Sequence, residues 1–408
     1  MVRHPTPLVK VIWSMFKAPL GGLIPFLGLL FCGTLCAAMI VPFMAFFIVQ
    51  GLGHEPRVIS LYSLLAICLT VAVNRAFARR IDAGQRVFPL VGIAALSYGA
   101  ATASLMVAPN LWVVLSLGVL GFGVSSSAVS TMFSLGGSLA ERSDVGRPRF
   151  NAYMRATSST AWMVGPAVAF LVADRVSHVA VFATGFGTSL IWLGLWWCIL
   201  PRDIVAPSPP RAPDAAANTA ATRALWMAGA FVFCLSSAHS LTFSALPLFY
   251  VQEVGLPGYA PGTAFSVKTF VEVFAIFATP LLIARIGMRA ALLGTTVLAV
   301  VTIQLLSMVH SYPQMLAGAA LEGLYYGFYA SLGISYVQSF APDRPAQATA
   351  IYWNTVMISG VLAGPAVGFI AQAYDFRTVV QVASGVALGA AVVLVLGRRA
   401  SEAAQTAE

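Results

Sequence analysis

The sequence GPAVAF at residues 165–170 returns almost unchanged as GPAVGF at residues 364–369. The two copies lie 199 positions apart (364 − 165), and each sits inside a long apolar stretch. A near-identical hexapeptide in two such stretches indicates a duplicated chain whose halves carry corresponding helices. Parallel repeats related by an axis along the membrane normal are found in transporters, so we expect a membrane carrier built from two similar halves.

The composition is that of a membrane protein. Hydrophobic residues make up 59% of the chain and charged residues 9%, whereas soluble domains carry about 25% charged residues. Apolar runs of about 20 residues, each long enough to cross a hydrocarbon core of about 30 Å, recur along the whole chain. The sequence therefore predicts an all-α integral membrane protein with twelve transmembrane helices. We place them at residues 20–49, 58–77, 88–107, 111–139, 150–173, 178–200, 224–250, 262–284, 290–309, 313–340, 347–373 and 378–397.

Basic residues predict the orientation of these helices. Of the 23 Lys and Arg residues, Arg57, Arg175 and Arg377 fall on one side of the predicted membrane, and Arg155 and Lys268 fall within spans. All the others fall on the opposite side. Cytoplasmic loops carry the excess of basic residues, so we expect both termini in the cytoplasm.

A stretch rich in proline and alanine at residues 201–223 divides the chain. It is too short and too polar to form a domain, and it predicts a cytoplasmic linker. We expect an N-terminal six-helix bundle over residues 1–200. A C-terminal six-helix bundle with a short cytoplasmic tail is expected over residues 224–408. The offset of 199 residues agrees with two six-helix pseudo-repeats.

Two loops at equivalent places carry a turn glycine flanked by arginines. Residues 79–86 read RRIDAGQR, and residues 284–289 read ARIGMR, without the acid. This pattern resembles the cytoplasmic loop motif of the major facilitator superfamily. The resemblance implies that charge contacts around Asp82, Gly84 and Arg86 hold one conformation of a carrier.

The repeated Gly-Pro pairs carry a further resemblance. Gly165 and Pro166 resemble the span-five motif of exporters in the same superfamily, and Gly364 and Pro365 repeat them in span eleven. Proline removes a helical hydrogen bond and glycine allows close backbone approach, so both pairs are expected to shape conformational change. A generic transmembrane kink is the alternative interpretation.

Four further segments resemble one family within this superfamily, the bacterial sugar efflux transporters. They read FNAYMRA at 150–156, LPLF at 246–249, EVGLP at 253–257 and QSFAPDR at 338–344. The resemblance implies an exporter of sugars or small glycosides in the bacterial inner membrane. We expect it to work by proton-coupled antiport and alternating access, and uncoupled sugar exit stays open. A proton-coupled exporter of multiple drugs or small metabolites shares the general pattern and stays open. A monomer with a small-molecule substrate, protons and lipid as its partners is expected.

Enzymatic chemistry is not expected from this sequence. The five histidines are scattered without metal-ligand spacing, and no phosphate-cradling loop precedes a lysine. We therefore expect no cofactor, no metal, no nucleic-acid partner and no catalytic residues.

Ionisable side chains inside the predicted spans are the candidates for proton coupling, because each costs a few kcal/mol if it faces lipid. They are His239 in span seven, Lys268 and Glu272 in span eight, and Glu322 in span ten. Lys268 and Glu272 are spaced i,i+4 and can form a structural ion pair, or Glu272 can bind the coupling proton. Glu322 lies near mid-membrane without a basic residue in its own helix, which suits a protonatable carboxyl. His239 fits a helix contact or a proton relay.

Aromatic residues around Glu322 indicate a substrate site. Tyr325, Tyr326 and Tyr329 follow it within two helical turns. Their rings can stack on the apolar faces of sugars, while their hydroxyls and the carboxyl bind sugar hydroxyls. The same set would suit a cationic aromatic drug, or serve only as core packing.

Four residues of spans five and eleven complete the predicted site. Asn354 occupies the position of Arg155 in the repeat (155 + 199 = 354), and equivalent positions face the shared cleft if either does. Trp162 and Trp353 lie in the same two spans. Arg155, Trp162, Trp353 and Asn354 are therefore predicted substrate contacts.

Overall fold

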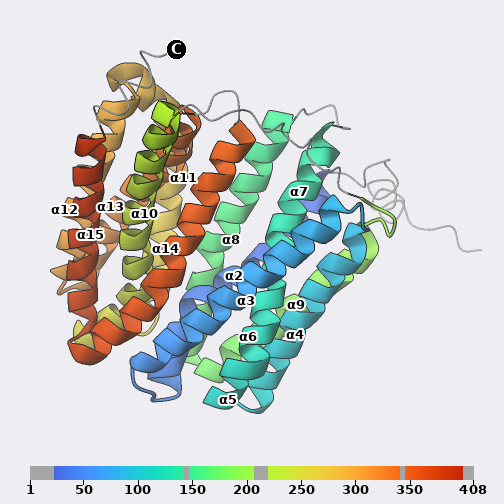
Figure 1. Cartoon of the computed structure of the whole chain (residues 1–408). Coiled ribbons are helices and arrows are strands. Elements are labelled where there is room, and N and C mark those ends of the chain that lie inside the picture. Colours follow the sequence, from blue (N-terminus) through green and yellow to red (C-terminus); the bar gives the residue numbers. More distant parts are fainter. Residues whose placement is uncertain (1–22, 142–146, 206–218, 341–344, 398–408) are drawn as a thin grey trace, which may run out of the picture. The chain divides into compact units, whose positions relative to one another are not determined.

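The computed structural model describes residues 23–141, 147–205, 219–340 and 345–397, and almost all of them are helical (Figure 1). The helices run in this order: α2 (Leu23–Phe46) with the π-helical turn η1 (Phe47–Gly51), α3 (Arg57–Asp82), α4 (Val87–Val107), α5 (Leu111–Val113), η2 (Val114–Gly118), α6 (Val119–Ser125), α7 (Ser127–Glu141), α8 (Arg147–Arg175), α9 (His178–Ile199), α10 (Thr219–Leu248) with η3 (Phe249–Glu253), α11 (Ala260–Ile286), α12 (Met288–Ser307), α13 (Tyr312–Gln338), α14 (Pro345–Ala373) and α15 (Phe376–Leu396).

The described residues form twelve long helical segments when the pieces from α5 to α7 are taken together. Within the described residues, 11 helices are long and apolar enough to cross a membrane. The remaining segment, α13, has 27 residues, but its glycines, tyrosines and Glu322 lower its hydropathy. The chain is therefore an all-α, multi-pass membrane protein. The two-repeat arrangement and the cytoplasmic termini stay predictions.

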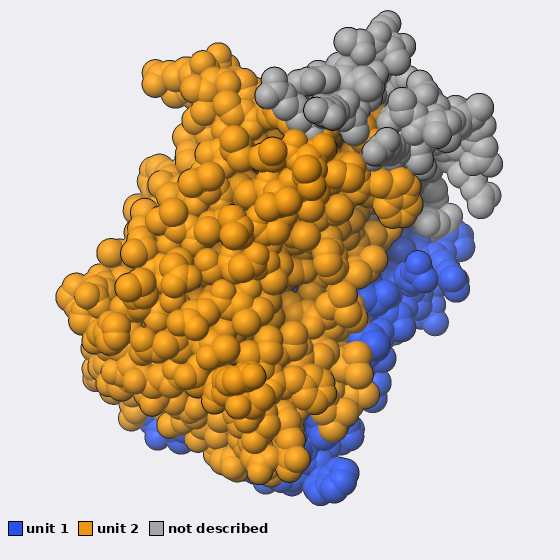
Figure 2. Space-filling view, turned by 60° about the vertical axis from the view of Figure 1, so that its left-hand side comes forward, with its two compact units in different colours: residues 1–41, 68–165, 176–209 blue, residues 42–67, 166–175, 210–408 orange. Residues whose placement is uncertain are grey.

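Contacts between helices divide the chain into two compact units, which are coloured separately in Figure 2. Unit 1 comprises residues 1–41, 68–165 and 176–209, and unit 2 comprises residues 42–67, 166–175 and 210–408. In unit 1, α4 packs against α9 and α6; in unit 2, α10 packs against α14 and α15, and α11 packs against α13. The predicted linker at 201–223 stays a prediction, and its residues 206–218 lie outside the described part of the chain.

The first Gly-Pro pair lies inside α8, and its glycine, which belongs to unit 1, contacts α2 there. A Cβ atom placed on Gly165 would lie 2.8 Å from the Cβ of Ala38 and 3.0 Å from its carbonyl carbon. Pro166 follows within the same uninterrupted helix. Because no side chain fits at position 165, the two backbones approach as closely as small residues allow in membrane helices.

The second Gly-Pro pair makes a comparable contact within unit 2. A Cβ atom on Gly364 of α14 would lie 2.6 Å from the Cβ of Ser63 in α3. The hydroxyl of Ser60 donates a hydrogen bond to the carbonyl oxygen of Pro365 over 2.7 Å. Gly360, one turn earlier, faces open space, so the close contact of α14 with α3 involves Gly364 and not Gly360.

The loop that resembles the superfamily motif is a tight turn between α3 and α4. Gly84 adopts the left-handed region at φ 71°, which favours glycine. Arg86 is exposed, and Val87 N donates to the carbonyl oxygen of Ile204 over 2.9 Å. The side chain of Asp82 lies outside what the structure describes, so the charge contacts of this motif stay predictions.

The close contact at Gly165 predicts a large effect from a single methyl group. Gly165→Ala forces Ala38 or the backbone of α2 to move and lowers stability by about 1–3 kcal/mol, the usual cost of overpacking. Gly187 of α9, where an added Cβ would meet nothing within 4 Å, provides the matched control Gly187→Ala. Thermal unfolding of both purified variants in detergent checks this, and equal midpoints would contradict the proposed contact.

Candidate functional site

An ion pair lies buried between α11 and α13 in unit 2. The Nζ atom of Lys268 lies 3.3 Å from Oε1 of Glu322. Lys268 is 5% exposed and Glu322 is 4% exposed. Buried charges require partners, because their desolvation costs several kcal/mol per ion. Glu322 has no basic residue in its own helix, as expected. Its basic partner, Lys268, comes from α11.

His239 of α10 adds a third polar group to this pair. Its Nε2 atom lies 3.2 Å from Lys268 Nζ, and its Nδ1 atom lies 3.1 Å from the hydroxyl oxygen of Tyr325. An ammonium group can only donate, so Nε2 accepts and Nδ1 carries the hydrogen of the neutral imidazole. Nδ1 also lies 3.7 Å from Glu322 Oε1. His239 therefore joins α10 to both charged residues, as a helix contact that also touches the acid.

Aromatic rings enclose the lysine. Its Nζ atom lies 4.9 Å from the ring centroid of Tyr326 and 5.2 Å from that of Phe243, within reach of cation–π attraction. The ring of Tyr326 also stacks on His239, with centroids 3.8 Å apart. The ammonium of Lys268 is thus held by a carboxylate, an imidazole and two aromatic faces.

Two glycines of α13 allow this arrangement. A Cβ atom on Gly323 would collide with the carbonyl oxygen of Lys268, and one on Gly327 would lie 2.7 Å from the Cβ of Ala275. Gly323 and Gly327 are spaced i,i+4, the spacing of small residues that lets membrane helices approach closely. They bring the backbone of α11 against α13 at the turn that carries Glu322.

The predicted tyrosines occupy different surroundings. Tyr325 and Tyr329 are fully buried between helices, while Tyr326 is half-buried beside His239. The hydroxyl of Tyr329 donates to the carbonyl oxygen of Val232 over 3.1 Å and lies 2.6 Å from the Oγ atom of Ser236. Tyr329 therefore ties α13 to α10, as expected of core packing, and Tyr325 and Tyr326 belong to the charged cluster.

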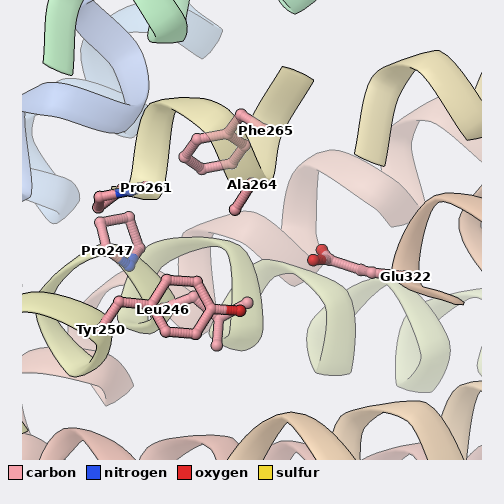
Figure 3. A pocket seen from close by; sticks show the side chains of 7 residues that line it. All are labelled: Leu246, Pro247, Tyr250, Pro261, Ala264, Phe265 and Glu322. Carbon is pink, nitrogen blue, oxygen red and sulfur yellow. The ribbon is translucent and has the colours of Figure 1, made fainter. Parts of the chain in front are cut away.

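A small cavity opens beside Glu322 on the side of Tyr250 (Figure 3). The volume open to the centre of a water-sized sphere is only about 10 Å³, far below the roughly 300–1,000 Å³ of small-molecule sites. The lining residues are Leu246, Pro247, Tyr250, Pro261, Ala264, Phe265 and Glu322. Figure 3 shows the hydroxyl of Tyr250 and the carboxyl of Glu322 reaching toward the space between them.

The remaining predicted residues lie elsewhere. Trp353 and Asn354 are exposed on α14, and the ring of Trp353 packs edge-on against buried Tyr352 with centroids 5.3 Å apart. Arg155 is exposed and Trp162 half-buried on α8 in unit 1. The pairing of Arg155 with Asn354 across the two halves stays a prediction.

Glu272 lies one turn beyond Lys268 on α11 and is half-buried. Its backbone passes Gly323 and Gly327, with the Glu272 nitrogen 3.1 Å from the Cβ position of Gly323. The ion pair of Lys268 with Glu322 joins two helices, whereas the predicted pairing of Lys268 with Glu272 runs along one helix and stays a prediction.

Sequence comparison relates the chain to known membrane carriers. The sequence profile of the Major Facilitator Superfamily matches residues 225–408. Sugar efflux transporter A of Dickeya chrysanthemi is 24% identical over 377 residues, which cover 90% of this chain and 93% of that protein. Sugar efflux transporter C of Escherichia coli (strain K12) is 24% identical over 379 residues, which cover 91% of this chain and 94% of that protein.

A solved structure has the same fold. A crystal structure of a mutant of the nucleoside transporter NupG superposes with a TM-score of 0.79 at 12% sequence identity. The alignment covers 92% of this chain and 99% of that one.

The matching family and these relatives are those of membrane transporters. Residues 225–408 match the Major Facilitator Superfamily, and the chain resembles sugar efflux transporters along most of its length. The resemblance seen in the sequence motifs is thereby confirmed.

Two features of this site were not identified from the sequence. The spacing of Gly323 and Gly327 was a usable signal, because small residues four apart in an apolar helix indicate close helix contact. Tyr250 gave no comparable signal: it is one of several aromatic residues near the end of a span, and only the folded structure turns its hydroxyl toward Glu322.

The close approach of α11 and α13 predicts that Gly323→Ala separates Lys268 from Glu322. We expect stability to fall by about 1–3 kcal/mol from overpacking, with transport lost as well. Gly294→Ala on α12, where an added Cβ meets nothing within 4 Å, is the control. Thermal unfolding and substrate uptake, measured side by side, check this; a Gly323→Ala protein as stable and active as the control would contradict it.

Proposed function

We propose that the chain exports sugars or small glycosides across the bacterial inner membrane in exchange for protons, by alternating access of one central site. The names of its relatives support the substrate class. The observation that carries the coupling is the buried pair of Lys268 and Glu322, 3.3 Å apart. Ionisable residues in membrane helices are functional by default, since otherwise they only cost stability.

Competition between proton and sugar follows from the surroundings of this pair. Protonation of Glu322 removes the negative charge that compensates Lys268 in a medium of low dielectric constant. Sugar hydroxyls can hydrogen-bond to Lys268 and to the ionised carboxylate, whereas the protonated carboxyl no longer offers a charged acceptor. The proton and the sugar therefore favour different forms of the same cluster, which is what exchange requires.

The cluster suits a neutral substrate better than an organic cation. The carboxylate that would attract a cationic drug is already paired with Lys268, and the ring faces of Tyr326 and Phe243 are already covered by the same ammonium. A second cation would meet the charge of Lys268. This favours sugar export over the multidrug alternative.

The other predicted residues take supporting roles in this proposal. Arg155, Trp162, Trp353 and Asn354 are proposed to line the substrate path from both halves. Glu272 is the alternative acid for the coupling proton.

Conformational change is assigned to the repeated motifs. The two Gly-Pro pairs and the turn at Gly84 are proposed to permit and to hold the inward-open and outward-open forms. The transporter is proposed to work as a monomer, with both termini in the cytoplasm.

Uptake of radiolabelled lactose into everted membrane vesicles with an acid interior tests this function. We expect accumulation that depends on the proton gradient, competed by glucosides and not by cationic dyes. Replacing both acids, Glu272→Gln and Glu322→Gln, is expected to abolish gradient-driven accumulation while exchange of labelled for unlabelled sugar persists, because exchange needs no net proton movement.

Two results would contradict the proposal. Uptake of a cationic dye in place of lactose would assign the chain to multidrug export. Full pH dependence of lactose transport in the double variant would remove both acids from the coupling mechanism.

A further inference from the structure

The cavity beside Glu322 contains two buried polar atoms without hydrogen bonds. Among the described residues, neither the Tyr250 hydroxyl nor Oε1 of Glu322 has a hydrogen-bond partner, although Lys268 compensates the charge of the carboxylate. Tyr250 is 1% exposed and Glu322 is 4% exposed. Buried polar groups are nearly always satisfied by protein or by ordered water, so two unsatisfied groups facing one space indicate a bound polar molecule.

The size and walls of the cavity limit what this molecule can be. Its other five lining residues are apolar, and the volume open to the centre of a water molecule is about 10 Å³. This is below the usual range of small-molecule sites, and a disaccharide with many hydroxyls would find too few polar partners there. The space suffices for about one water molecule, which can bridge the two polar groups.

The cavity lies between Glu322 and the predicted outer side of the membrane. Tyr250 belongs to η3, which ends at Glu253, and Pro261 lies in the first turn of α11 on the same side. Glu322 is ten residues into α13 (322 − 312), which is about 15 Å at 1.5 Å per residue and near the middle of the membrane. A proton from outside would therefore meet Tyr250 before it meets Glu322.

We propose that this cavity holds water bridging the Tyr250 hydroxyl to Glu322 Oε1, and that Tyr250 relays protons between the outer solution and Glu322. The inference rests on the proposed proton coupling at Glu322. It adds a proton route that is separate from the sugar path and too narrow for sugar.

The transfer conserves protons and charge. A hydronium ion at the outer side gives a proton to the Tyr250 oxygen as the hydroxyl passes its own proton to the cavity water. The water then passes a proton to Glu322 Oε1, where an O–H bond forms on the carboxylate. Tyr250 and the water end neutral, and Glu322 ends as a neutral carboxylic acid.

The other groups facing Glu322 lie away from this route. Lys268 and Glu272 come from α11, His239 from α10, and Tyr325 and Tyr326 from the same helix as Glu322. None of them lines the cavity. Besides Glu322, Tyr250 is therefore the polar residue that lines the cavity.

Tyr250→Phe tests the relay, because it keeps the ring and removes the hydroxyl. Gradient-driven lactose accumulation in everted vesicles is expected to slow by about tenfold or more, as when a positioned proton-transfer group is lost. Exchange of labelled for unlabelled lactose is expected to persist. The matched control is Tyr98→Phe in unit 1, which removes another buried tyrosine hydroxyl that does not line this cavity and is expected to change neither rate.

Infrared difference spectra of the purified transporter, recorded across a pH step, test the water bridge without transport. The carbonyl band of protonated Glu322 is identified by its loss in Glu322→Gln. Its frequency is expected to shift in Tyr250→Phe and to stay unchanged in Tyr98→Phe, since only the former alters the hydrogen bonds of this carboxyl.

The outcomes separate this inference from the proposed function. Failure of the unmodified protein to accumulate lactose contradicts the function, and the infrared band then decides the water site alone. Normal accumulation by Tyr250→Phe together with an unshifted band overturns the relay. If Tyr250→Phe does not reach the membrane, Ala264→Leu, which fills the cavity and leaves the hydroxyl, is expected to slow accumulation in the same way; normal accumulation there also overturns the relay.

Discussion

The ion pair between Lys268 and Glu322 is the interaction on which the C-terminal site depends. Neither charge can remain in the membrane interior alone, and removing one partner of such a pair typically costs about 3–5 kcal/mol because the other is left uncompensated. The surrounding groups serve this pair. His239 accepts from the lysine, and aromatic rings cover the rest of the ammonium. Protonation of the Glu322 carboxylate therefore forces the whole cluster to rearrange. In this way the binding of one proton changes the packing of α10, α11 and α13.

Close helix packing supplies the geometry that the pair needs. Apolar burial does not drive helices together in lipid, so contact depends on small residues that let backbones approach. Gly323 and Gly327 provide this between α11 and α13, as Gly165 does between α8 and α2. The ion pair and the glycines depend on each other. The glycines set the distance between the charges, and the charges hold together a contact that dispersion alone would stabilise weakly.

Much of this architecture could be predicted from the sequence, because apolar length and basic loops report directly on membrane helices. The span expected at residues 313–340 is the helix Tyr312–Gln338, with Glu322 inside it. The partner of Glu322 could not be predicted, since spacing along one helix points Lys268 to Glu272. Which residues meet between two helices depends on the orientation of each helix about its own axis. The pattern of apolar residues does not specify this orientation when both helices are apolar on most sides. Tyr250 could not be identified from the sequence for the same reason, because only folding places its hydroxyl at a cavity shared with Glu322.

A double-mutant cycle on the ion pair measures the coupling between Lys268 and Glu322. Unfolding of purified Lys268→Met, Glu322→Gln and the doubly substituted protein would be compared with that of the unmodified protein in one detergent. We predict that each single change is strongly destabilising and that the double change costs less than their sum by more than about 1 kcal/mol, the signature of direct coupling. Additive effects would mean that the two charges act independently, and the coupling mechanism built on their pairing would be wrong.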